Sequence, residues 1–372
     1  MSNMIFYNSY DIFINPNNRD KLKEVPGGEA FSCYFEIFSR NISAIDRTNS
    51  ISIPLKTTLL PHLQMPVMEK MDKSFEEICD GRARFLLDKA SQSNKKIAVM
   101  YSGGVDSTLI LVSFLKVAKE EELKNIIVLL SDQSIRENTN FYYDYVIKKF
   151  ECASSYRFPY FLGNDDYLLI SGENADQLFG SQVNDQFAES AGYDSLFKPI
   201  SEVKEQIIDW FKVRVKNKQY AEPIYGLFEK IVDNAPIELD NVYKFWWWVN
   251  FTTKWQSVYV RVLPYSQNKS TLKIEENYTT FFSPKEFQLW SMNNTDKFTK
   301  QTPTSSKYVP KEIIFDFNKD EGYLKKPKVG SLAHLVQRKE MIMYLDQNMN
   351  YGKEYPTEDM YNYDNDFERI MK

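Results

Sequence analysis

Short apolar runs alternate with helical patterns through the middle of the sequence. The runs 97–101, 125–130 and 167–170 have the length and the aliphatic, β-branched composition of buried strands. Between them, apolar residues recur at helical spacing over 109–118 and 141–150. Because strands that alternate with helices of this length usually pair in parallel, the pattern predicts an α/β fold with a doubly wound parallel sheet.

The segment before this core has a different pattern. Residues 1–73 are β-leaning and interrupted by prolines, and the run 31–38 partly alternates as a half-buried strand would. A helix is predicted over 74–90, where Ser74 and Glu77 form a capping-box pattern. The sequence therefore predicts a small β-leaning N-terminal region ahead of the core.

Longer helices and loops follow the core, and the clearest helices are predicted over 205–215 and 243–262. We therefore expect three regions: a β-leaning region (1–73), an α/β core (74–183) and a helical C-terminal part (184–372). The second of the two predicted helices carries three consecutive tryptophans. Together with Trp255 and Tyr259 they recur at helical spacing, which favours a place in the core or at an interface over a stacking platform for bases.

Composition and charge narrow the class of protein. The 372 residues are 43% hydrophobic and 15% aromatic, which is enough to bury a sizeable core. The net charge of −5 gives no support for a nucleic-acid partner, which usually meets a basic face.

The cysteines indicate the compartment. Cys33, Cys79 and Cys152 form no CxxC pair, as expected in a reducing compartment. There is no secretory leader and no apolar run of the about 18 residues that cross a bilayer, so we expect a cytoplasmic protein without a membrane segment.

The hexapeptide SGGVDS, which starts at Ser102, carries the strongest chemical signal. It follows an apolar strand and opens a helix, so Gly103 and Gly104 let the backbone approach an anion at the positive end of that helix. Ser102 and Ser107 add hydroxyl donors. Asp106 fits beside phosphates when a divalent cation lies between them, and Mg²⁺ is bound by one or two carboxylates together with substrate phosphates. The hexapeptide therefore predicts a site for a phosphate-bearing ligand and Mg²⁺.

Two motifs resemble those of a known superfamily. SGGVDS is similar to the pyrophosphate-binding loop of the N-type ATP pyrophosphatases and lacks the GK[ST] ending of a kinase P-loop. The decapeptide SGENADQLFG, which begins at Ser171 after another strand, is similar to the second signature of asparagine synthetase and β-lactam synthetase. The chain thus resembles the synthetase domain of these enzymes over residues 75–335, and the resemblance implies an adenine nucleotide α-hydrolase-like sheet.

The resemblance also implies a reaction and roles for particular residues. ATP would be split between its α- and β-phosphates to activate a small-molecule carboxylate as an acyl-adenylate, and ammonia or an amine would then form the amide. Asp106 and Asp176 would share one Mg²⁺ on the phosphates, since the ends of two parallel strands meet at one crevice. Glu173 would take a proton from the incoming amine, and Gly172 would leave room for the adenine.

Two further assignments complete the predicted site. Ser131, at the end of the second strand, stands where this superfamily contacts adenosine, although it could equally be a helix cap. The run VPKEII, which starts at Val309, resembles the stretch after which these enzymes place a lysine that stabilises charge during adenylation. Lys328 and Lys319 are the candidates, and a Lys-x-Gly pattern favours Lys328. The alternative is an ordinary solvated lysine.

Departures from the family leave the acceptor and the nitrogen source open. The glutaminase domain of asparagine synthetase is not found in this sequence, so nitrogen would come from free ammonia, a separate glutaminase partner or an amine substrate. A homo-oligomer is also left open. Two alternatives remain: a nucleotide- or tRNA-modifying ATP pyrophosphatase, which the sparse cysteines disfavour, and a degenerate relative that binds ATP as a regulatory module.

Overall fold

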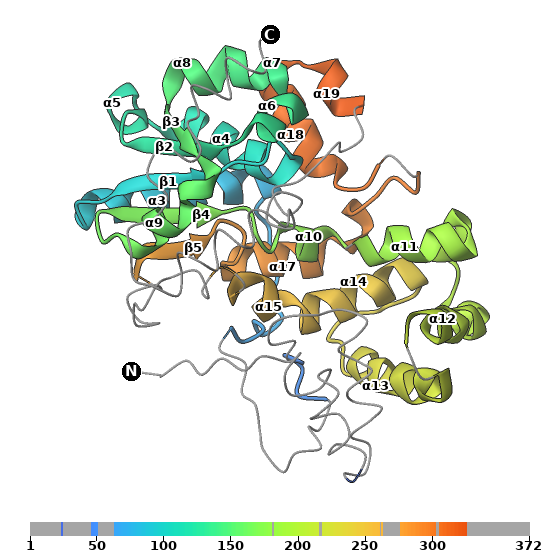
Figure 1. The fold of residues 1–372 in the computed structure, drawn as a ribbon. Helices are drawn as coiled ribbons and strands as arrows, with labels where there is room; N and C mark the ends of the chain where they lie inside the picture. Colours follow the sequence, from blue (N-terminus) through green and yellow to red (C-terminus); the bar gives the residue numbers. More distant parts are fainter. Residues whose placement is uncertain are drawn as a thin grey trace. The chain divides into compact units, whose positions relative to one another are not determined.

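The chain forms two compact units in a computed structural model (Figure 1). The structure describes residues 24, 46–50, 63–180, 182–215, 218–260, 262, 276–302 and 305–325. Unit 1 takes its described residues from Met1–Met71, Asn174–Arg261 and Lys285–Ser306, and unit 2 takes them from Asp72–Glu173, Val262–Pro284 and Lys307–Lys372. Each unit is therefore assembled from segments that are distant in sequence, and the boundaries predicted at 73 and 183 stay a prediction.

Unit 2 is built on a sheet that has five parallel strands in the described part of the chain. The strands are β1 Lys96–Met100, β2 Ile126–Leu130, β3 Glu151–Ser154, β4 Tyr167–Ser171 and β5 Tyr278–Thr280. Their order is β3-β2-β1-β4-β5, so the chain moves outward from β1 to β3 and then crosses to the other side of β1 (Figure 1). This order is typical of doubly wound sheets, and the predicted α/β fold with a parallel sheet is confirmed at that level.

The central strands form where the apolar runs predict them, because helices cover the sheet and every residue of β2 is buried. β3 and β5 do not stand out in the sequence. β3 has four residues, of which only Ser154 is buried, and β5 has three residues. Both are edge strands of the described sheet, and such short segments have no periodicity that a sequence pattern can reveal.

The helices of unit 2 come before, between and after its strands. They are α3 Phe75–Gln92, α4 Val105–Val117, α5 Glu120–Leu123, α6 Asp132–Glu137, α7 Thr139–Phe141, α8 Ile147–Lys149, α9 Phe158–Gly163, α18 Tyr308–Asn318 and α19 Glu321–Lys325. The capping box of α3 is confirmed. The Ser74 hydroxyl accepts from the Glu77 N–H at 3.2 Å, and the Glu77 carboxylate accepts from the Ser74 N–H at 2.7 Å.

The helix predicted over 141–150 is interrupted by a π-helical turn, Tyr142–Val146, between α7 and α8. The N–H of Ile147 donates to the carbonyl of Tyr142, five residues earlier. Phe141, Tyr142 and Val146 are all buried, so the π-helical turn keeps the apolar side of this segment in the interior of the unit.

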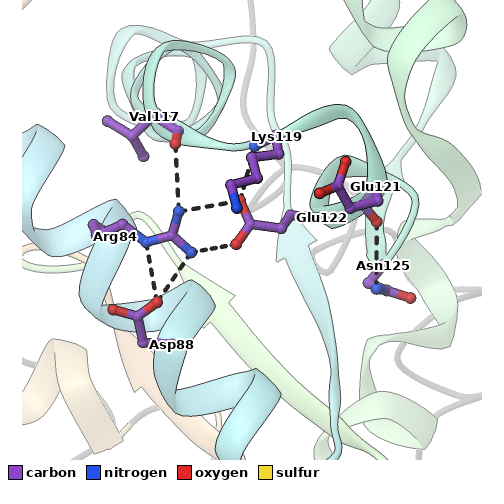
Figure 2. A network of polar contacts seen from close by, with 7 residues as sticks. All are labelled: Arg84, Asp88, Val117, Lys119, Glu121, Glu122 and Asn125. Carbon is purple, nitrogen blue, oxygen red and sulfur yellow. Dashed lines mark hydrogen bonds and ion pairs between the residues drawn. The ribbon is translucent and has the colours of Figure 1, made fainter.

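Arg84 ties α3 to the end of α4 and to α5 (Figure 2). Its guanidinium donates to both carboxylate oxygens of Glu122, lies 3.0 Å from the carboxylate of Asp88 and donates to the Val117 carbonyl at 3.4 Å. Glu122 also accepts from the backbone N–H of Lys119 at 2.8 Å. The Arg84 hydrogen bond, followed by that from Lys119, lowers the pKa of the Glu122 carboxyl to about 2.

Unit 1 is helical in its described part. Its helices include α10 Ala175–Phe179, α11 Gln182–Ala191, α12 Ile200–Arg214, α13 Ala221–Asp233, α14 Val242–Thr253, α15 Trp255–Val260 and α17 Lys285–Asn293. The tryptophans Trp246, Trp247 and Trp248 are fully buried in α14, which confirms their expected place in the core. The single helix predicted over 243–262 is instead two helices, which separate at Lys254.

Arg47 fastens the described N-terminal residues to the helices of unit 1. Its buried guanidinium donates to the carbonyls of Leu63, Gln64 and Phe251 at 2.8, 3.0 and 3.3 Å. The strand predicted over 31–38 and the segment after 355 lie outside the described residues. Within the described residues, no helix combines the length and the apolar content needed to span a membrane.

Candidate functional site

The carboxyl ends of β1 and β4 lie side by side, because the two strands pair in parallel with Val99 opposite Ile170. The other neighbour of β1 is β2, so the order of strands reverses between β1 and β4. Open α/β sheets bind ligands outside the carboxyl ends of their strands at such a reversal. The turns that follow Met100 and Ser171 therefore begin at one edge of the sheet.

The turn between β1 and α4 requires glycine at position 103. Gly103 has a φ of +74°, and a Cβ there would lie 2.3 Å from the Ser134 carbonyl oxygen and 2.7 Å from the Glu137 Cβ. Gly104 is the N-cap of α4 and supplies no side-chain cap. The first turn of α4 thus starts without a side-chain acceptor, and the positive end of the helix dipole lies at this turn.

Two serine hydroxyls hold the turn closed. Ser107 Oγ accepts from the Ser102 N–H at 3.1 Å, and it donates to the Gly104 carbonyl at 3.1 Å. Ser102 Oγ accepts from the Gly104 N–H at 3.3 Å. Ser107 is buried and Ser102 is half-buried. Ser107 therefore shapes the turn, and Ser102 is the hydroxyl better positioned to meet a ligand.

Asp106, in the first turn of α4, pairs with a lysine that the sequence analysis missed. The Nζ atom of Lys307 lies 2.8 Å from each carboxylate oxygen of Asp106. The two side chains are only 15% and 24% exposed. Lys307 is the N-cap of α18 and stands 201 positions from Asp106, so no local pattern relates them. The one nearby signal is the motif that begins at Val309.

Gly172 brings the second turn against the first. A Cβ on Gly172 would lie 3.4 Å from the Asp106 Cβ and 3.6 Å from the Ser107 backbone nitrogen. The space that a side chain at position 172 would fill is therefore the space beside the first turn of α4. Glycine at this position lets the two turns approach each other this closely.

Glu173 follows Gly172 and is half-buried. Its N–H donates to Ser171 Oγ at 3.4 Å, and Ser171 Oγ lies 2.9 Å from the hydroxyl of Tyr278 in β5. These bonds fix the end of β4 and thereby the start of the turn that carries Glu173. Asp176 is exposed and belongs to α10 in unit 1, so the Mg²⁺ shared with Asp106 stays a prediction.

Tyr323 of α19 fastens the first turn from a distant part of the sequence. Its hydroxyl donates to the Gly103 carbonyl at 3.0 Å and lies 3.4 Å from Thr108 Oγ1. Burial raises the pKa of the Tyr323 hydroxyl far above its usual value, which keeps it a neutral donor. The segment formed by α18 and α19 therefore contacts the turn and the start of α4 at two points, through Lys307 and Tyr323.

The other residues predicted for the site are Ser131, Lys319 and Lys328. Ser131 is the buried N-cap of α6, where its Oγ accepts from the Ser134 N–H at 3.4 Å. The helix-cap alternative is therefore confirmed, and its contact with adenosine stays a prediction. Lys319 is exposed and pairs with Asp316 at 2.9 Å. Lys328 lies outside the described residues.

The groups at this edge of the sheet fit a phosphate-bearing ligand. The start of α4, the Ser102 hydroxyl and the Lys307 ammonium are groups that bind anions. Asp106 offers the kind of oxygen that Mg²⁺ prefers, and Mg²⁺ usually completes its coordination with substrate phosphates and water. The described residues contain no group of three or more His, Cys, Asp or Glu side chains that could hold a metal ion by themselves.

Comparison with known proteins gives no family model that matches the sequence and no curated protein that matches it.

Proposed function

We propose that the protein is an ATP-dependent carbon–nitrogen ligase that activates a carboxylate as an acyl-adenylate and forms an amide. The observation that supports this most directly is the meeting of two strand-end turns, with Gly172 against Asp106 and the Ser107 amide. A phosphate chain bound at the start of α4 would meet backbone amides, the Ser102 hydroxyl and the Lys307 ammonium. The motifs at both turns resemble those of AMP-forming amide synthetases, and this resemblance supplies the reaction class.

In the proposed reaction a carboxylate oxygen attacks the α-phosphorus of ATP, and the bond to the oxygen that bridges to the β-phosphate breaks. Pyrophosphate leaves, and an acyl-adenylate remains. The nitrogen of ammonia or of an amine then attacks the acyl carbon, the bond to AMP breaks, and the nitrogen loses a proton. Holding both reactants at one sheet edge would supply much of the rate by fixing their distance and orientation.

Particular residues would carry these steps. The first amides of α4 and the Ser102 hydroxyl would bind the phosphates that leave as pyrophosphate. Asp106, with Asp176 as the second ligand predicted from the sequence, would hold Mg²⁺, which offsets charge on the leaving group when it is bound. Glu173 is half-buried in the turn that follows β4, and its carboxylate would accept the proton of the attacking nitrogen. Lys328 stays the lysine predicted from the sequence to stabilise charge during adenylation.

The sequence also predicts a fold group, a compartment and a nitrogen source for this enzyme. The sheet would belong to the adenine nucleotide α-hydrolase-like group, and the protein would work in the cytoplasm. Nitrogen would come from free ammonia, an amine substrate or a separate glutaminase partner. A homo-oligomer stays an open expectation.

Exchange of labelled pyrophosphate into ATP, measured with a panel of carboxylates, tests the proposal. The wild-type protein should exchange label only when its carboxylate is present. Asp106→Ala and Asp176→Ala should each lose about 100-fold or more in exchange rate, since each removes charge stabilisation at the leaving group. Asp209→Ala is the control, because this exposed carboxylate of α12 pairs with Lys212. Absence of exchange with every carboxylate would reject adenylation, and wild-type exchange in Asp106→Ala would reject its role as a metal ligand.

The pairing of Asp106 with Lys307 favours a second candidate function, a module that binds nucleotide without chemistry. A carboxylate that is bonded through both oxygens to an ammonium already has a counter-ion. Nucleotide would then bind without the divalent cation that phosphoryl chemistry usually needs. Calorimetry with ATP, followed by chromatography for AMP, separates the two candidates: tight binding without AMP in the presence of every carboxylate favours the module.

The alternative of a nucleotide- or tRNA-modifying enzyme, in the form that transfers sulfur through a reactive cysteine, is not favoured by the described cysteines. Burial raises the pKa of the Cys152 thiol to about 12, and it also raises the pKa of the Cys79 thiol far above its usual value. Neither group is therefore a reactive thiolate near neutral pH. Cys33 lies outside the described residues.

A further inference from the structure

Lys307 contacts both carboxylate oxygens of Asp106. Its Nζ atom is 2.8 Å from both oxygens, so the ammonium sits between them and not on one alone. Both side chains are largely buried. A charge pair in this setting is screened far less by water than an exposed surface pair.

A divalent cation on Asp106 would have to compete with this ammonium. Mg²⁺ binds a carboxylate oxygen at about 2.1 Å, which would bring it within about 5 Å of the Lys307 Nζ. Like charges at that distance repel strongly in a partly buried site. The ammonium and the metal ion therefore bind Asp106 as alternatives.

The position of Lys307 is set by the fold. Lys307 is the N-cap of α18, and α18 packs against α4, the helix that carries Asp106. Its backbone adopts the left-handed conformation, with a φ of 56°, which a non-glycine residue rarely adopts. The start of α18 thus directs the Lys307 ammonium to the first turn of α4. By contrast, the exposed Lys319 pairs with Asp316, only three positions away along the chain.

We propose that Lys307 is the resident counter-ion of Asp106 and that a divalent cation must displace it. The inference deepens the proposed function and rests on it for the identity of the metal as Mg²⁺ on a nucleotide. A phosphate group gives the displaced ammonium a new anionic partner, whereas a metal ion alone does not. Lys307 is therefore a positioning residue that makes metal binding depend on the phosphates of the ligand.

Binding of Mn²⁺ alone, without nucleotide, tests this competition. Mn²⁺ suits carboxylate oxygens as Mg²⁺ does, and its free concentration can be followed by electron paramagnetic resonance. The Lys307→Met variant, which keeps the length of the side chain without its charge, should bind Mn²⁺ at least about tenfold more tightly than the wild type, within the usual range of coupling between two sites. Lys319→Met, which removes an exposed lysine of the same segment, should behave as the wild type.

The double variant Asp106→Asn/Lys307→Met identifies the site. It should lose the Mn²⁺ binding gained in Lys307→Met, because the carboxylate is gone. Equal Mn²⁺ affinity in the wild type and in Lys307→Met would overturn the proposal. So would a gain in affinity that survives in the double variant.

A second measurement uses the unaltered protein, in case Lys307→Met fails to fold. Labelling with an amine-specific reagent, read by mass spectrometry, should modify Lys307 more once Mn²⁺ is raised until it saturates the protein, while modification of Lys319 stays constant. Unchanged or reduced labelling of Lys307 in the Mn²⁺-saturated protein would contradict displacement. Neither measurement needs catalysis, so failure of pyrophosphate exchange would reject the proposed reaction and leave the competition at Asp106 to be judged separately.

Discussion

The hydroxyl of Tyr323 donates a hydrogen bond to the carbonyl oxygen of Gly103 at 3.0 Å, across 220 positions of sequence. The same carbonyl accepts from the hydroxyl of Thr108 at 3.3 Å. The turn that precedes α4 is thus held by hydroxyl groups from two helices, α4 and α19. A turn that is fixed before its ligand arrives loses less conformational entropy on binding.

Replacement of Tyr323 by Phe should loosen this turn. The variant removes one hydroxyl and leaves the Gly103 carbonyl with one donor fewer, which should cost about 1 kcal/mol in the free energy of unfolding. Under the proposed function, ATP affinity should also fall, because part of the binding energy would be used to order the turn. Urea denaturation and calorimetry with ATP measure the two effects.

Tyr225→Phe is the control for this variant, because Tyr225 is a buried tyrosine of α13 in unit 1 whose ring stacks on Phe245, a contact that phenylalanine can also make. It should match the wild type in both measurements. If Tyr323→Phe also matched the wild type in stability and in affinity, the hydrogen bond to Gly103 would have no role in holding the turn.

Gly103→Ala should destabilise the protein strongly. A Cβ at Gly103 would lie 2.3 Å from a backbone oxygen, and its φ of +74° is unfavourable for alanine. Strain and overpacking together should cost about 2–4 kcal/mol in the free energy of unfolding. Gly81→Ala is the matched control, because Gly81 lies inside α3 and a Cβ there would meet nothing within 4 Å. It should be neutral or stabilising by about 1 kcal/mol, and a similar loss in both variants would contradict the described turn.

Gly172→Ala should separate ligand binding from stability. The added Cβ would make its closest contact at 3.4 Å, which the fold can accept, so the free energy of unfolding should change by less than about 1 kcal/mol. The methyl group would occupy the space next to the Ser107 amide, and under the proposed function ATP affinity should fall about tenfold or more. Thermal unfolding and calorimetry test this. An unchanged ATP affinity would mean that the nucleotide does not lie against Gly172.

The Arg84–Glu122 pair should stabilise the protein only above acidic pH. The pKa of Glu122 is lowered from 4.5 to about 2 in the folded protein, so the folded state binds fewer protons than the unfolded state in this range. The contribution is full above about pH 4.5 and is lost as the pH falls towards 2. Because the pair lies near the surface, Glu122→Gln should cost about 1 kcal/mol at pH 7. Urea denaturation from pH 7 to pH 2.5 should show this difference shrinking, and Glu121→Gln, which leaves the Arg84–Glu122 pair intact, is the control.

Local sequence patterns predicted the elements that are stabilised by contacts between residues close together in the sequence. β2 is five buried apolar residues in sequence, and the capping box of α3 joins residues three positions apart. The interruption of the helix predicted over 141–150 could not be read in this way, because the buried residues Phe141, Tyr142 and Val146 have a spacing that also fits an unbroken helix. The break at Lys254 is a similar case, in a stretch that is apolar throughout.

In the candidate site, too, local features were predicted from the sequence and contacts between distant residues were not. SGGVDS and the turn at Gly172 were predicted from sequence, since a glycine turn between a strand and a helix is a local feature. Lys307 and Tyr323 were not predicted, because a lysine or a tyrosine that contacts a loop has the same local sequence as one on the surface. Lys328, which the Lys-x-Gly pattern favours, lies outside the described residues, and the lysine that pairs with Asp106 is Lys307.

The sequence by itself determined that parallel strands end in two glycine-containing turns, because hydrophobic period, strand length and glycine conformation act between near neighbours. Only the tertiary structure decided which distant groups face those turns, and in unit 2 it brought a lysine and a tyrosine of one late segment to the start of α4. The physical reason is that such contacts depend on how α18 and α19 pack after the chain has returned to the sheet. That packing is set by the shape and burial of the whole unit and leaves no periodic trace along the chain.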